Sequence, residues 1–351
     1  MNQERKRRVL IVDDSALVRQ VLTNILSRHP MLEVVGIAKD PYDARERIKE
    51  LNPDVLTLDV EMPRMDGLTF LGKLMKAHPM PAVMLSSLTA KGTTTALDAL
   101  DLGAVDVIGK PAMDQAAGLE AMGAEIAETV YAASLARVMG SRPAPALHAS
   151  LAPLAQRAKA GRALIAIGSS TGGTEALRQV FEAIPENLPP IAVVQHMLPG
   201  FTTAFAERLD RTCRARVKVA ADGEPLKPGT VYLAPNEAHL TVGRHALGLV
   251  AILRAGDRVS RHLPSVDVLF QSVAEACGSH AMGVILTGMG DDGARGLLQM
   301  RQRGARTLGQ DEATCVVYGM PRAAYMRGAV EEQASLSTIA SHLVTWCGRE
   351  G

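Results

Sequence analysis

Cysteines and aromatic residues are scarce in this chain of 351 residues. It contains one Trp, five Tyr and five Phe, and its four cysteines (Cys213, Cys277, Cys315 and Cys347) are far apart and form no CxxC pair. This spacing argues against a disulfide framework and against a zinc site. Together with the lack of a signal peptide at the start, it favours a reducing cytoplasm.

Long apolar runs and an excess of charge of either sign are also missing. No run approaches the roughly 20 apolar residues that a membrane-spanning helix needs. Basic and acidic residues nearly balance, at 38 and 37, so the total charge does not favour a nucleic-acid partner. We therefore expect a cytoplasmic protein with no nucleic-acid partner and no membrane insertion, and the length suggests two domains.

Five short apolar runs alternate with helical patterns over residues 1–129. The alternation predicts an α/β fold, a doubly wound (flavodoxin-like) parallel sheet of five strands. The predicted strands are Val9–Val12, Val34–Ala38, Val55–Leu58, Ala82–Ser86 and Val105–Ile108. In such a sheet, the site lies past the carboxyl ends of the strands.

Polar residues stand at those carboxyl ends. Asp13 and Asp14 follow the first strand, Asp59 the third, Ser86 the fourth and Lys110 the fifth. Three converging carboxylates repel one another unless a cation joins them, and Mg²⁺ prefers such oxygen ligands. A carboxylate beside Mg²⁺ can attack phosphorus, and a hydroxyl and a lysine would bind the new phosphoryl oxygens. The alternative of helix caps suits Asp13 or Asp14 singly, but it does not explain the five residues together.

A second strand-turn-helix pattern begins at residues 163–174. An apolar run predicts a buried strand, three glycines then bracket two serines and a threonine, and a helical pattern follows. Gly168-x-Ser170-x-Gly172 fits a nucleophile elbow, in which small neighbours let the serine oxygen protrude from a sharp turn. A Gly/Ser turn of this kind can also cradle a phosphate, and the pattern alone does not decide between the two.

Three predicted strands of this half end in the groups of a Ser-His-Asp triad. They are Ser170, His196 and Asp292, which lie along one edge if the sheet is parallel. In a triad the histidine takes the serine proton and the acid fixes the histidine tautomer. Backbone amides of Thr171 and Met289 would form an oxyanion hole. The alternatives are a structural histidine at a strand end and an aspartate that caps the helix after it.

The composition between the two halves, over residues 130–161, changes to Ala, Pro, Ser, Arg and His. Residues 141–145 cannot be helical, because each proline biases the residue before it away from that conformation. We interpret the segment as a partly mobile linker. The predicted organisation is a first domain over 1–129, a linker over 130–161, and a second α/β domain with a mostly parallel sheet over 162–351.

The first half carries the motifs Asp13–Asp14–Ser15, Leu58–Gly67, Ser86 and Lys110–Pro111. Together they resemble the receiver domain of two-component response regulators. The resemblance implies that Asp59 is phosphorylated by a histidine kinase, that Asp14, Asp59 and the carbonyl of Glu61 hold Mg²⁺, and that Ser86 and Lys110 sense the phosphoryl group. One departure is Val107, which stands where receivers often carry an aromatic switch residue.

The second half carries a further set of motifs: Ile167–Leu177, Gln195–Met197, Ala234–Pro235, Pro264–Phe270, Gly283–Gly293 and Gly319–Pro321. These resemble the catalytic domain of the chemotaxis protein-glutamate methylesterase (CheB) family. The resemblance implies hydrolysis of glutamyl methyl esters on methyl-accepting chemoreceptors, and deamidation of specific receptor glutamines, with no cofactor for the esterase reaction. It implies Ser170 as nucleophile, His196 as general base and acid, and Asp292 as the orienting carboxylate, with Thr171 and Met289 supplying oxyanion-hole amides.

Three positions depart from the family pattern: Ser169 replaces the more usual Ala, Leu263 a common Arg, and Asp291 a frequent Asn. Ser169 leaves open which hydroxyl reacts, although the spacing favours Ser170. The resemblance further implies that the unphosphorylated receiver covers the catalytic cleft and that phosphorylation opens it. The alternative is a non-catalytic response regulator whose output domain only binds a receptor or another partner, and a complete triad argues against it.

Overall fold

The computed structural model describes residues 5–87, 90–110, 115–136, 163–197, 200–246 and 248–349. The chain divides into two compact units, Met1–Pro143 and Ala144–Gly351. A helix over Gly123–Ser134 occupies the start of the predicted linker, and linker residues 137–161 lie outside the described residues. The domain boundaries of the sequence analysis therefore stay predictions.

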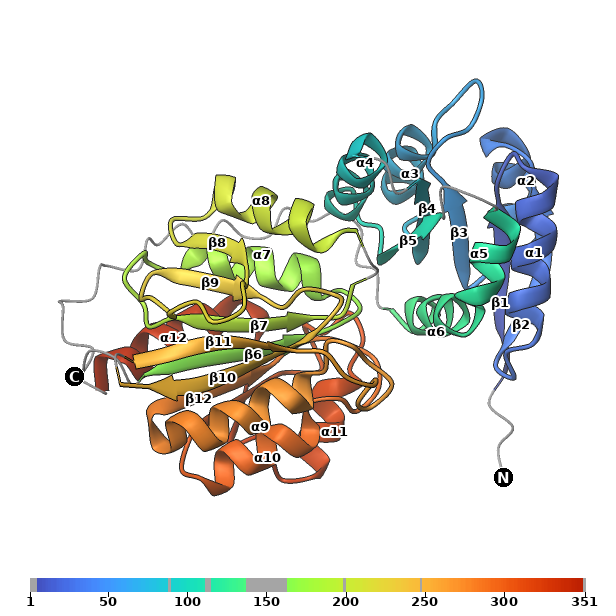
Figure 1. Ribbon diagram of the computed structural model, residues 1–351. Coiled ribbons are helices and arrows are strands. Elements are labelled where there is room, and N and C mark those ends of the chain that lie inside the picture. The colour runs from blue at the N-terminus through green and yellow to red at the C-terminus, as the bar shows by residue number, and fades with distance from the viewer. Residues whose placement is uncertain are drawn as a thin grey trace. The chain divides into compact units, whose positions relative to one another are not determined.

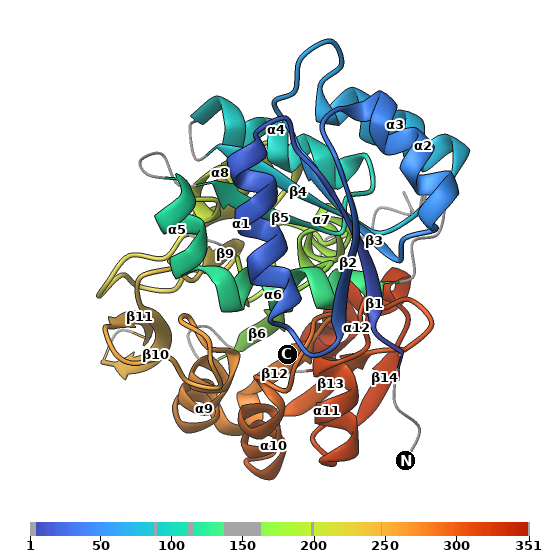
Figure 2. The same ribbon diagram turned by 90° about the vertical axis from the view of Figure 1, so that its right-hand side faces the viewer.

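The N-terminal unit is a five-stranded sheet with helices between its strands (Figures 1 and 2). Its elements are β1 (Arg7–Val12), α1 (Ala16–Ser27), β2 (Leu32–Ala38), α2 (Pro41–Leu51), β3 (Val55–Asp59), α3 (Gly67–Ala77), β4 (Ala82–Ser87), α4 (Ala90–Asp101), β5 (Asp106–Lys110), α5 (Gln115–Ala121) and α6 (Gly123–Ser134). The strand order is β2-β1-β3-β4-β5, and every neighbouring pair is parallel. The predicted doubly wound parallel sheet is confirmed.

Right-handed crossovers explain the layers of this unit. The step from β1 to β2 runs one way along the sheet and the later steps run the other way. Helix α1 therefore lies on one face and α2, α3 and α4 on the other, while α5 and α6 pack with α1. Aliphatic side chains fill both interfaces, and Leu10, Leu56 and Met84 on the central strands are fully buried.

Gly67 fixes the path of the chain after β3. A Cβ atom at this position would lie 1.9 Å from the carbonyl oxygen of Asp59, and the Gly67 amide donates to the carbonyl of Val60 at 2.9 Å. Asp66 caps α3 by accepting the amide of Thr69 at 2.7 Å. Helix α3 thus starts directly against the end of the strand that carries Asp59.

The C-terminal unit is built on a seven-stranded sheet with the order β14-β13-β12-β6-β7-β9-β8 and a separate hairpin, β10-β11. Its elements are β6 (Leu164–Ser169), α7 (Gly173–Ala183), β7 (Ile191–Gln195), α8 (Thr202–Thr212), β8 (Arg216–Val219), β9 (Thr230–Leu233), β10 (His239–His245), β11 (Gly248–Arg254), α9 (Val266–Cys277), β12 (Ala281–Ile285), α10 (Ala294–Gln302), β13 (Arg306–Gln310), α11 (Met320–Met326), β14 (Glu332–Ala334) and α12 (Leu336–Arg349). All neighbouring pairs of the seven strands are parallel, whereas β10 and β11 are antiparallel.

The order of the strands creates a topological switch point between β6 and β12. From β6 the chain continues to β7 on one side, and from β12 it continues to β13 on the other. Helices α9, α10 and α11 pack together on one face of the sheet, and α7 packs with α8 and α12 on the opposite face (Figure 1). Loops diverge at such a point, which leaves a crevice at the carboxyl ends of the strands.

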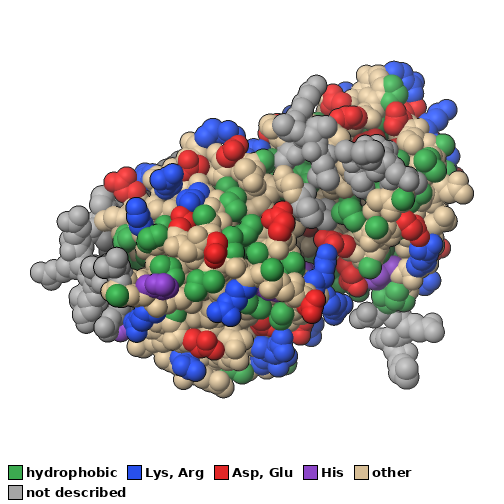
Figure 3. Space-filling view, in the orientation of Figure 1, with side chains coloured by type: hydrophobic (Ala, Val, Ile, Leu, Met, Phe, Trp, Pro, Cys, Tyr) green, Lys and Arg blue, Asp and Glu red, His purple; other side chains and the backbone are tan. Residues whose placement is uncertain are grey.

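The surface carries charges of both signs. On the face seen in Figure 3, Lys and Arg side chains are interspersed with Asp and Glu side chains over both units. The exposed large hydrophobic side chains of the described residues include Leu17 and Tyr42 in the first unit, and the adjacent pair Tyr325 and Met326 in the second. Across the same described ranges, no helix has the length and apolar character that a membrane span requires.

Gly67→Ala is expected to destabilise the N-terminal unit by about 3 kcal/mol, because the new methyl group would meet main-chain atoms of Asp59 and Val60 that cannot move aside. Scanning calorimetry of the full-length chain would show this as a lowered unfolding temperature. Gly72→Ala in the same helix is the control. Its methyl group would meet nothing closer than Leu102 Cδ1 at 4.0 Å, so we expect a gain of about 0.5–1 kcal/mol. Equal effects of the two variants would contradict this account of Gly67.

Candidate active site and acidic site

Ser170 lies in the turn that joins β6 to α7. Strand β6 is buried along its whole length, and Gly172 provides the left-handed residue of the turn with φ 75°. The Ser170 amide donates to the carbonyl of Thr287 at 3.0 Å, and the Ser170 carbonyl accepts from the Gly173 amide at 2.7 Å. The turn is therefore fixed both to itself and to the end of the neighbouring strand β12.

The two adjacent serines have different environments. Ser169 is fully buried, and its hydroxyl donates to Oε1 of Gln195 at 2.6 Å. The Gln195 amide group donates in turn to the carbonyls of Ser170 and His196, at 2.9 and 2.8 Å. Ser169 thus belongs to a bridge between β6 and β7, while the half-buried Ser170 is the serine at the open edge of the sheet.

His196 and Asp292 form a close pair at the same edge. The Nε2 atom of His196 lies 2.9 Å from Oδ2 of Asp292, and the two side chains are 9% and 1% exposed. A neutral imidazole whose Nε2 faces a carboxylate carries its proton on that nitrogen. Its Nδ1 atom is then the acceptor, and this atom is buried without a hydrogen-bond partner among the described residues.

Asp292 caps a helix other than the one that the sequence suggested. Helix α10, which follows it, has Gly293 at its N-cap position, a residue without a side chain that could cap it. The carboxylate instead accepts from the start of α9: from the Ser265 hydroxyl at 2.8 Å, the Val266 amide at 2.8 Å and the Asp267 amide at 3.0 Å. The interpretation as a cap of the following helix is therefore wrong, because the folded chain brings the start of α9 closer.

These contacts decide the charge of Asp292. Burial by itself raises the pKa of a carboxyl group, but the hydrogen bond from His196, with the donors at the start of α9, holds the pKa of Asp292 below its usual value. The helix N-terminus also favours a negative charge. Asp292 is therefore a stable anion.

The structure brings the two predicted oxyanion-hole segments to Ser170. Thr171 is buried, and its carbonyl accepts the hydroxyl of Thr287 at 3.0 Å. Gly288, which precedes Met289, is so close that a Cβ atom there would lie 2.7 Å from the Cβ of Ser170. The backbone of both segments therefore borders the serine.

His262 is a residue of this site that the sequence reasoning missed. Its ring stacks on the ring of His196, with centroids 3.7 Å apart and an interplanar angle of 9°. Burial, assisted by the neighbouring His196, lowers the pKa of His262 to about 3. Nothing in the spacing of the motifs pointed to this loop residue, because its place depends on the folded path of the chain.

The N-terminal unit gathers its acidic residues around a lysine at the carboxyl end of its sheet. Lys110 Nζ lies 2.7 Å from Oδ2 of Asp13 and 2.7 Å from Oδ2 of Asp59. Carboxylate oxygens of Asp13, Asp14 and Asp59 lie within 4.8 Å of one another. Three carboxylates and one lysine leave a net negative charge, and their oxygens suit a hard divalent cation.

In this acidic site, Asp59 has a raised pKa. Burial raises the pKa of its carboxyl group to about 6, an effect that Lys110 opposes and Asp13 reinforces. The amide of Glu61 donates to Oδ1 of Asp59 at 3.3 Å. Ser86 is buried on the neighbouring strand β4. The predicted receiver residues therefore converge at one strand edge.

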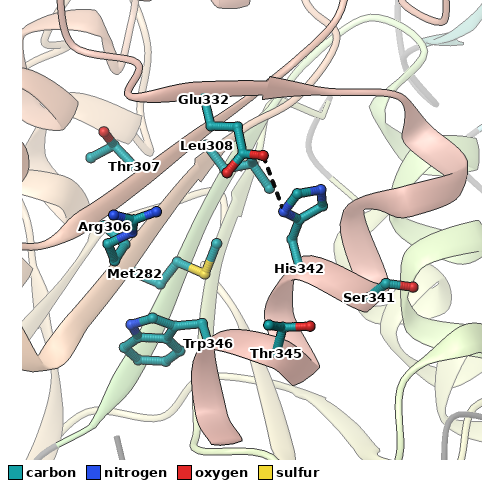
Figure 4. A pocket seen from close by; sticks show the side chains of 9 residues that line it. All are labelled: Met282, Arg306, Thr307, Leu308, Glu332, Ser341, His342, Thr345 and Trp346. Atoms are coloured by element: carbon teal, nitrogen blue, oxygen red, sulfur yellow. Dashed lines mark ion pairs between the residues drawn. The ribbon is translucent and has the colours of Figure 1, made fainter. Parts of the chain in front are cut away.

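A pocket of about 450 Å³ lies elsewhere in the C-terminal unit (Figure 4). It is lined by residues of β12, β13, β14 and α12, namely Met282, Arg306, Thr307, Leu308, Glu332, Ser341, His342, Thr345 and Trp346. An ion pair between Glu332 and His342 crosses it at 3.7 Å. Because Met282, Arg306 and Glu332 stand at the beginnings of their strands, the pocket is at the opposite sheet edge from Asp292.

Comparisons with known proteins identify the family to which each half of the chain is similar. The family model CheB methylesterase matches residues 165–343, and the family model for the response regulator receiver domain matches residues 9–121. A curated relative from Bordetella pertussis, named protein-glutamate methylesterase/protein-glutamine glutaminase, is 53% identical over 348 residues, with 99% of each chain covered. The chain belongs to the CheB methylesterase family.

Other members of the CheB family extend this finding. A relative from Xanthomonas campestris pv. campestris, named protein-glutamate methylesterase/protein-glutamine glutaminase 1, is 54% identical over 351 residues and is covered to 98%, as is this chain. The crystal structure of the CheB methylesterase catalytic domain from Thermotoga maritima is 39% identical, with a TM-score of 0.52, and the match covers 53% of this chain and 98% of that domain. The predicted family and fold are confirmed.

Asp59→Asn is expected to stabilise the N-terminal unit at pH 8 but not at pH 4, in metal-free buffer. The pKa of Asp59 is about 6 in the folded chain and about 3.9 in an unfolded one. The folded state therefore binds this proton more tightly, and its stability falls as the pH rises from about 4 to 6. The gain above pH 6 would be about 2–3 kcal/mol, measured as the shift of the calorimetric unfolding temperature.

Asp66→Asn serves as the control for this prediction. Hydrogen bonds from the Thr69 amide and hydroxyl keep the pKa of the exposed Asp66 below its usual value. Its stabilising charge is present above the unfolded pKa and is lost as the pH falls, so this variant should lose stability at pH 8. A gain for Asp59→Asn of the same size at both pH values would show that the raised pKa is not its source.

Proposed function

We propose that this chain is a phosphorylation-controlled hydrolase that removes methyl esters from glutamate residues of methyl-accepting chemoreceptors and also deamidates specific receptor glutamines. The observation that carries the proposal is the pairing of His196 with Asp292 beside the Ser170 turn, at the switch point of a parallel sheet. Relatives over 50% identical bear both activities in their names. Ester and amide hydrolysis share a tetrahedral oxyanion, so one site serves both.

Ser170 is the proposed nucleophile. Its Oγ attacks the carbonyl carbon of the glutamyl ester while its proton passes to Nδ1 of His196, because Nε2 is held by Asp292. His196 then protonates the leaving methoxide oxygen, and methanol departs from the acyl-enzyme. A water molecule attacks the acyl group with His196 again as base, and Ser170 recovers its proton as the glutamate is released. With a glutamine substrate, the first leaving group is ammonia.

The charge that develops in each step is matched by a fixed group. Asp292 stays ionised and stabilises the imidazolium form of His196. The backbone amides of Thr171 and Met289 would donate to the oxyanion, and their segments border Ser170. The esterase reaction in this proposal needs no cofactor.

The acidic site is the proposed control element. Asp59 would accept a phosphoryl group from a chemotaxis histidine kinase, and Asp14, Asp59 and the carbonyl of Glu61 would hold Mg²⁺. The bound ion would supply positive charge beside the transferred phosphoryl group. The residues fit this ion, because three carboxylates crowd around one lysine and the pKa of Asp59 is raised. Ser86 and Lys110 would bind the phosphoryl oxygens.

Control of a hydrolase by a receiver requires two arrangements of the chain. We propose that a receiver over 1–129, joined by a linker over 130–161 to a catalytic domain over 162–351, restricts the catalytic cleft until Asp59 is phosphorylated. Phosphorylation then shifts the population toward the active arrangement. A chemoreceptor cytoplasmic domain as substrate and a histidine kinase as phosphodonor would place this reaction in the cytoplasm.

Ser170→Ala is expected to lower methanol release from a methylated chemoreceptor cytoplasmic fragment by roughly 10³-fold or more, because the nucleophile is lost. Ser169→Ala is the matched control. It should retain most of the rate but lose about 1–3 kcal/mol of stability, because Oε1 of the buried Gln195 loses its donor. Equal loss of rate in the two variants would contradict the assignment of the nucleophile. No release by the wild-type chain, with Asp59 still phosphorylated, would favour the regulator that only binds a partner.

Acetyl phosphate with Mg²⁺ is expected to raise the rate of methanol release about tenfold, which corresponds to a population shift of about 1.4 kcal/mol. Asp59→Asn should keep the basal rate and lose the stimulation. Asp43→Asn, which removes a carboxylate paired with Arg47 on α2, should keep both. Stimulation that persists in Asp59→Asn would overturn the proposed control while leaving the hydrolase in place.

A further inference from the structure

The stacked imidazole rings of His196 and His262 impose a constraint that the His196–Asp292 pair cannot impose alone. Cβ holds the His196 ring on one side and the hydrogen bond at Nε2 holds it on the other, but the ring can still rotate about the line between these two points. A flat ring 3.7 Å away and inclined by only 9° fixes the plane. The two contacts together determine where Nδ1 points.

The charge of His262 suits this contact. Burial lowers the pKa of His262 to about 3, the neighbouring His196, Arg258 and Arg261 act in the same direction, and Asp292 acts against them. The ring is therefore neutral at physiological pH. A neutral neighbour can remain stacked when His196 becomes positively charged during proton transfer, whereas a charged one would repel it.

A strained turn carries His262 to this position. Val259 and His262 exchange two backbone hydrogen bonds, of 3.0 and 2.9 Å. The residues between them, Ser260 and Arg261, have φ values of 50° and 70°. Two left-handed residues in succession form a type I′ turn, whose two central positions favour Asn and Gly. A serine or an arginine in this left-handed conformation costs of order 1 kcal/mol, and such a conformation persists only where surrounding contacts fix it.

Asp267 supplies those contacts. This buried carboxylate accepts the Ser260 hydroxyl at 3.0 Å and the Arg295 guanidinium at 3.1 Å, and Arg295 also donates to the Ser260 oxygen at 3.1 Å. The other oxygen of Asp267 accepts the amides of Arg295 and Gly296 at the start of α10, at 3.1 and 2.8 Å. The turn is thus tied to the starts of α9 and α10, the same helix pair whose first member is capped by Asp292.

We infer that His262 is a positioning residue for His196. Its ring holds the imidazole of His196 in the plane in which Nε2 meets Asp292 and Nδ1 is presented to Ser170, and the turn anchored by Asp267 holds His262 in place. The inference rests on the proposed function, because it gives His262 a role in the proton transfers of that reaction. Since His262 acts through His196, its loss should change kcat rather than KM.

The test uses the full-length chain with four substitutions. His262→Ala removes the ring and is expected to lower kcat for methanol release about tenfold with KM within about twofold. His262→Phe keeps a flat ring without nitrogens and should stay within about threefold of the wild-type kcat, with an unchanged pH profile. Ser260→Ala removes the hydrogen bond to Asp267 and should lower kcat about threefold. His245→Ala, at the exposed end of β10, is the control for loss of a histidine and should have no effect.

A second readout separates this inference from the proposed substrate. A fluorophosphonate reacts as the Ser170 Oγ attacks phosphorus, fluoride leaves, and His196 takes the proton; the rate of labelling therefore reports the activation of Ser170. If the wild-type chain is labelled but releases no methanol, the proposed substrate is wrong. The labelling rates should still fall in the order wild type, His262→Phe, Ser260→Ala and His262→Ala. Circular dichroism and calorimetry confirm that each variant is folded.

Three results would overturn the inference. Wild-type rates in His262→Ala would show that the stack has no influence on His196. His262→Phe as slow as His262→Ala, or with a shifted pH profile, would show that a ring nitrogen of His262 takes part in proton transfer itself. A wild-type chain that neither reacts with the probe nor releases methanol would remove both this inference and the proposed hydrolase.

Discussion

The site of the C-terminal unit depends on one buried carboxylate. An ionised carboxylate inside a protein costs several kcal/mol unless donors surround it. Asp292 meets this requirement with the imidazole of His196, the hydroxyl of Ser265 and two amides at the start of α9. Because these donors come from two separate elements, the carboxylate joins the end of β7 to the start of α9 at the switch point of the sheet. The position of His196 follows from the same bond.

A second buried carboxylate, that of Asp267, holds the starts of α9 and α10 together in a reciprocal arrangement. Asp292 precedes α10 but caps α9, and Asp267 stands in the first turn of α9 but caps α10. Each helix therefore receives its capping charge from the segment that begins the other, so the two starts cannot separate without exposing two buried anions. The strained turn at Ser260 and Arg261 can exist because the Ser260 hydroxyl bonds to Asp267, which holds these two helix starts.

Local patterns were sufficient to predict most of the fold and the ends of its strands. The apolar runs and the glycine turns indicated two parallel sheets, and the carboxyl ends of parallel strands meet at one edge, which is why the acidic site could be anticipated and why Ser170, His196 and Asp292 were proposed together. The spacing favoured Ser170 over Ser169 as the reacting serine, and only the packing shows that Ser169 is turned toward Gln195. His262 could not be anticipated, because its turn contradicts the local preferences of its residues and is held by tertiary contacts with Asp267.

The two units use buried aspartates in opposite ways. Asp292 has enough donors to keep its pKa below the usual value, so its charge is permanent and can stabilise a transient cation beside it. Asp59 shares a single lysine with Asp13, and its pKa is raised to about 6. The number of donors, rather than burial, makes the difference, since both side chains are buried. A buried carboxylate with too few donors is stabilised by any event that removes its negative charge or brings a cation to it. Such a residue suits a switch, and a fully compensated one suits a permanent charge in a catalytic site.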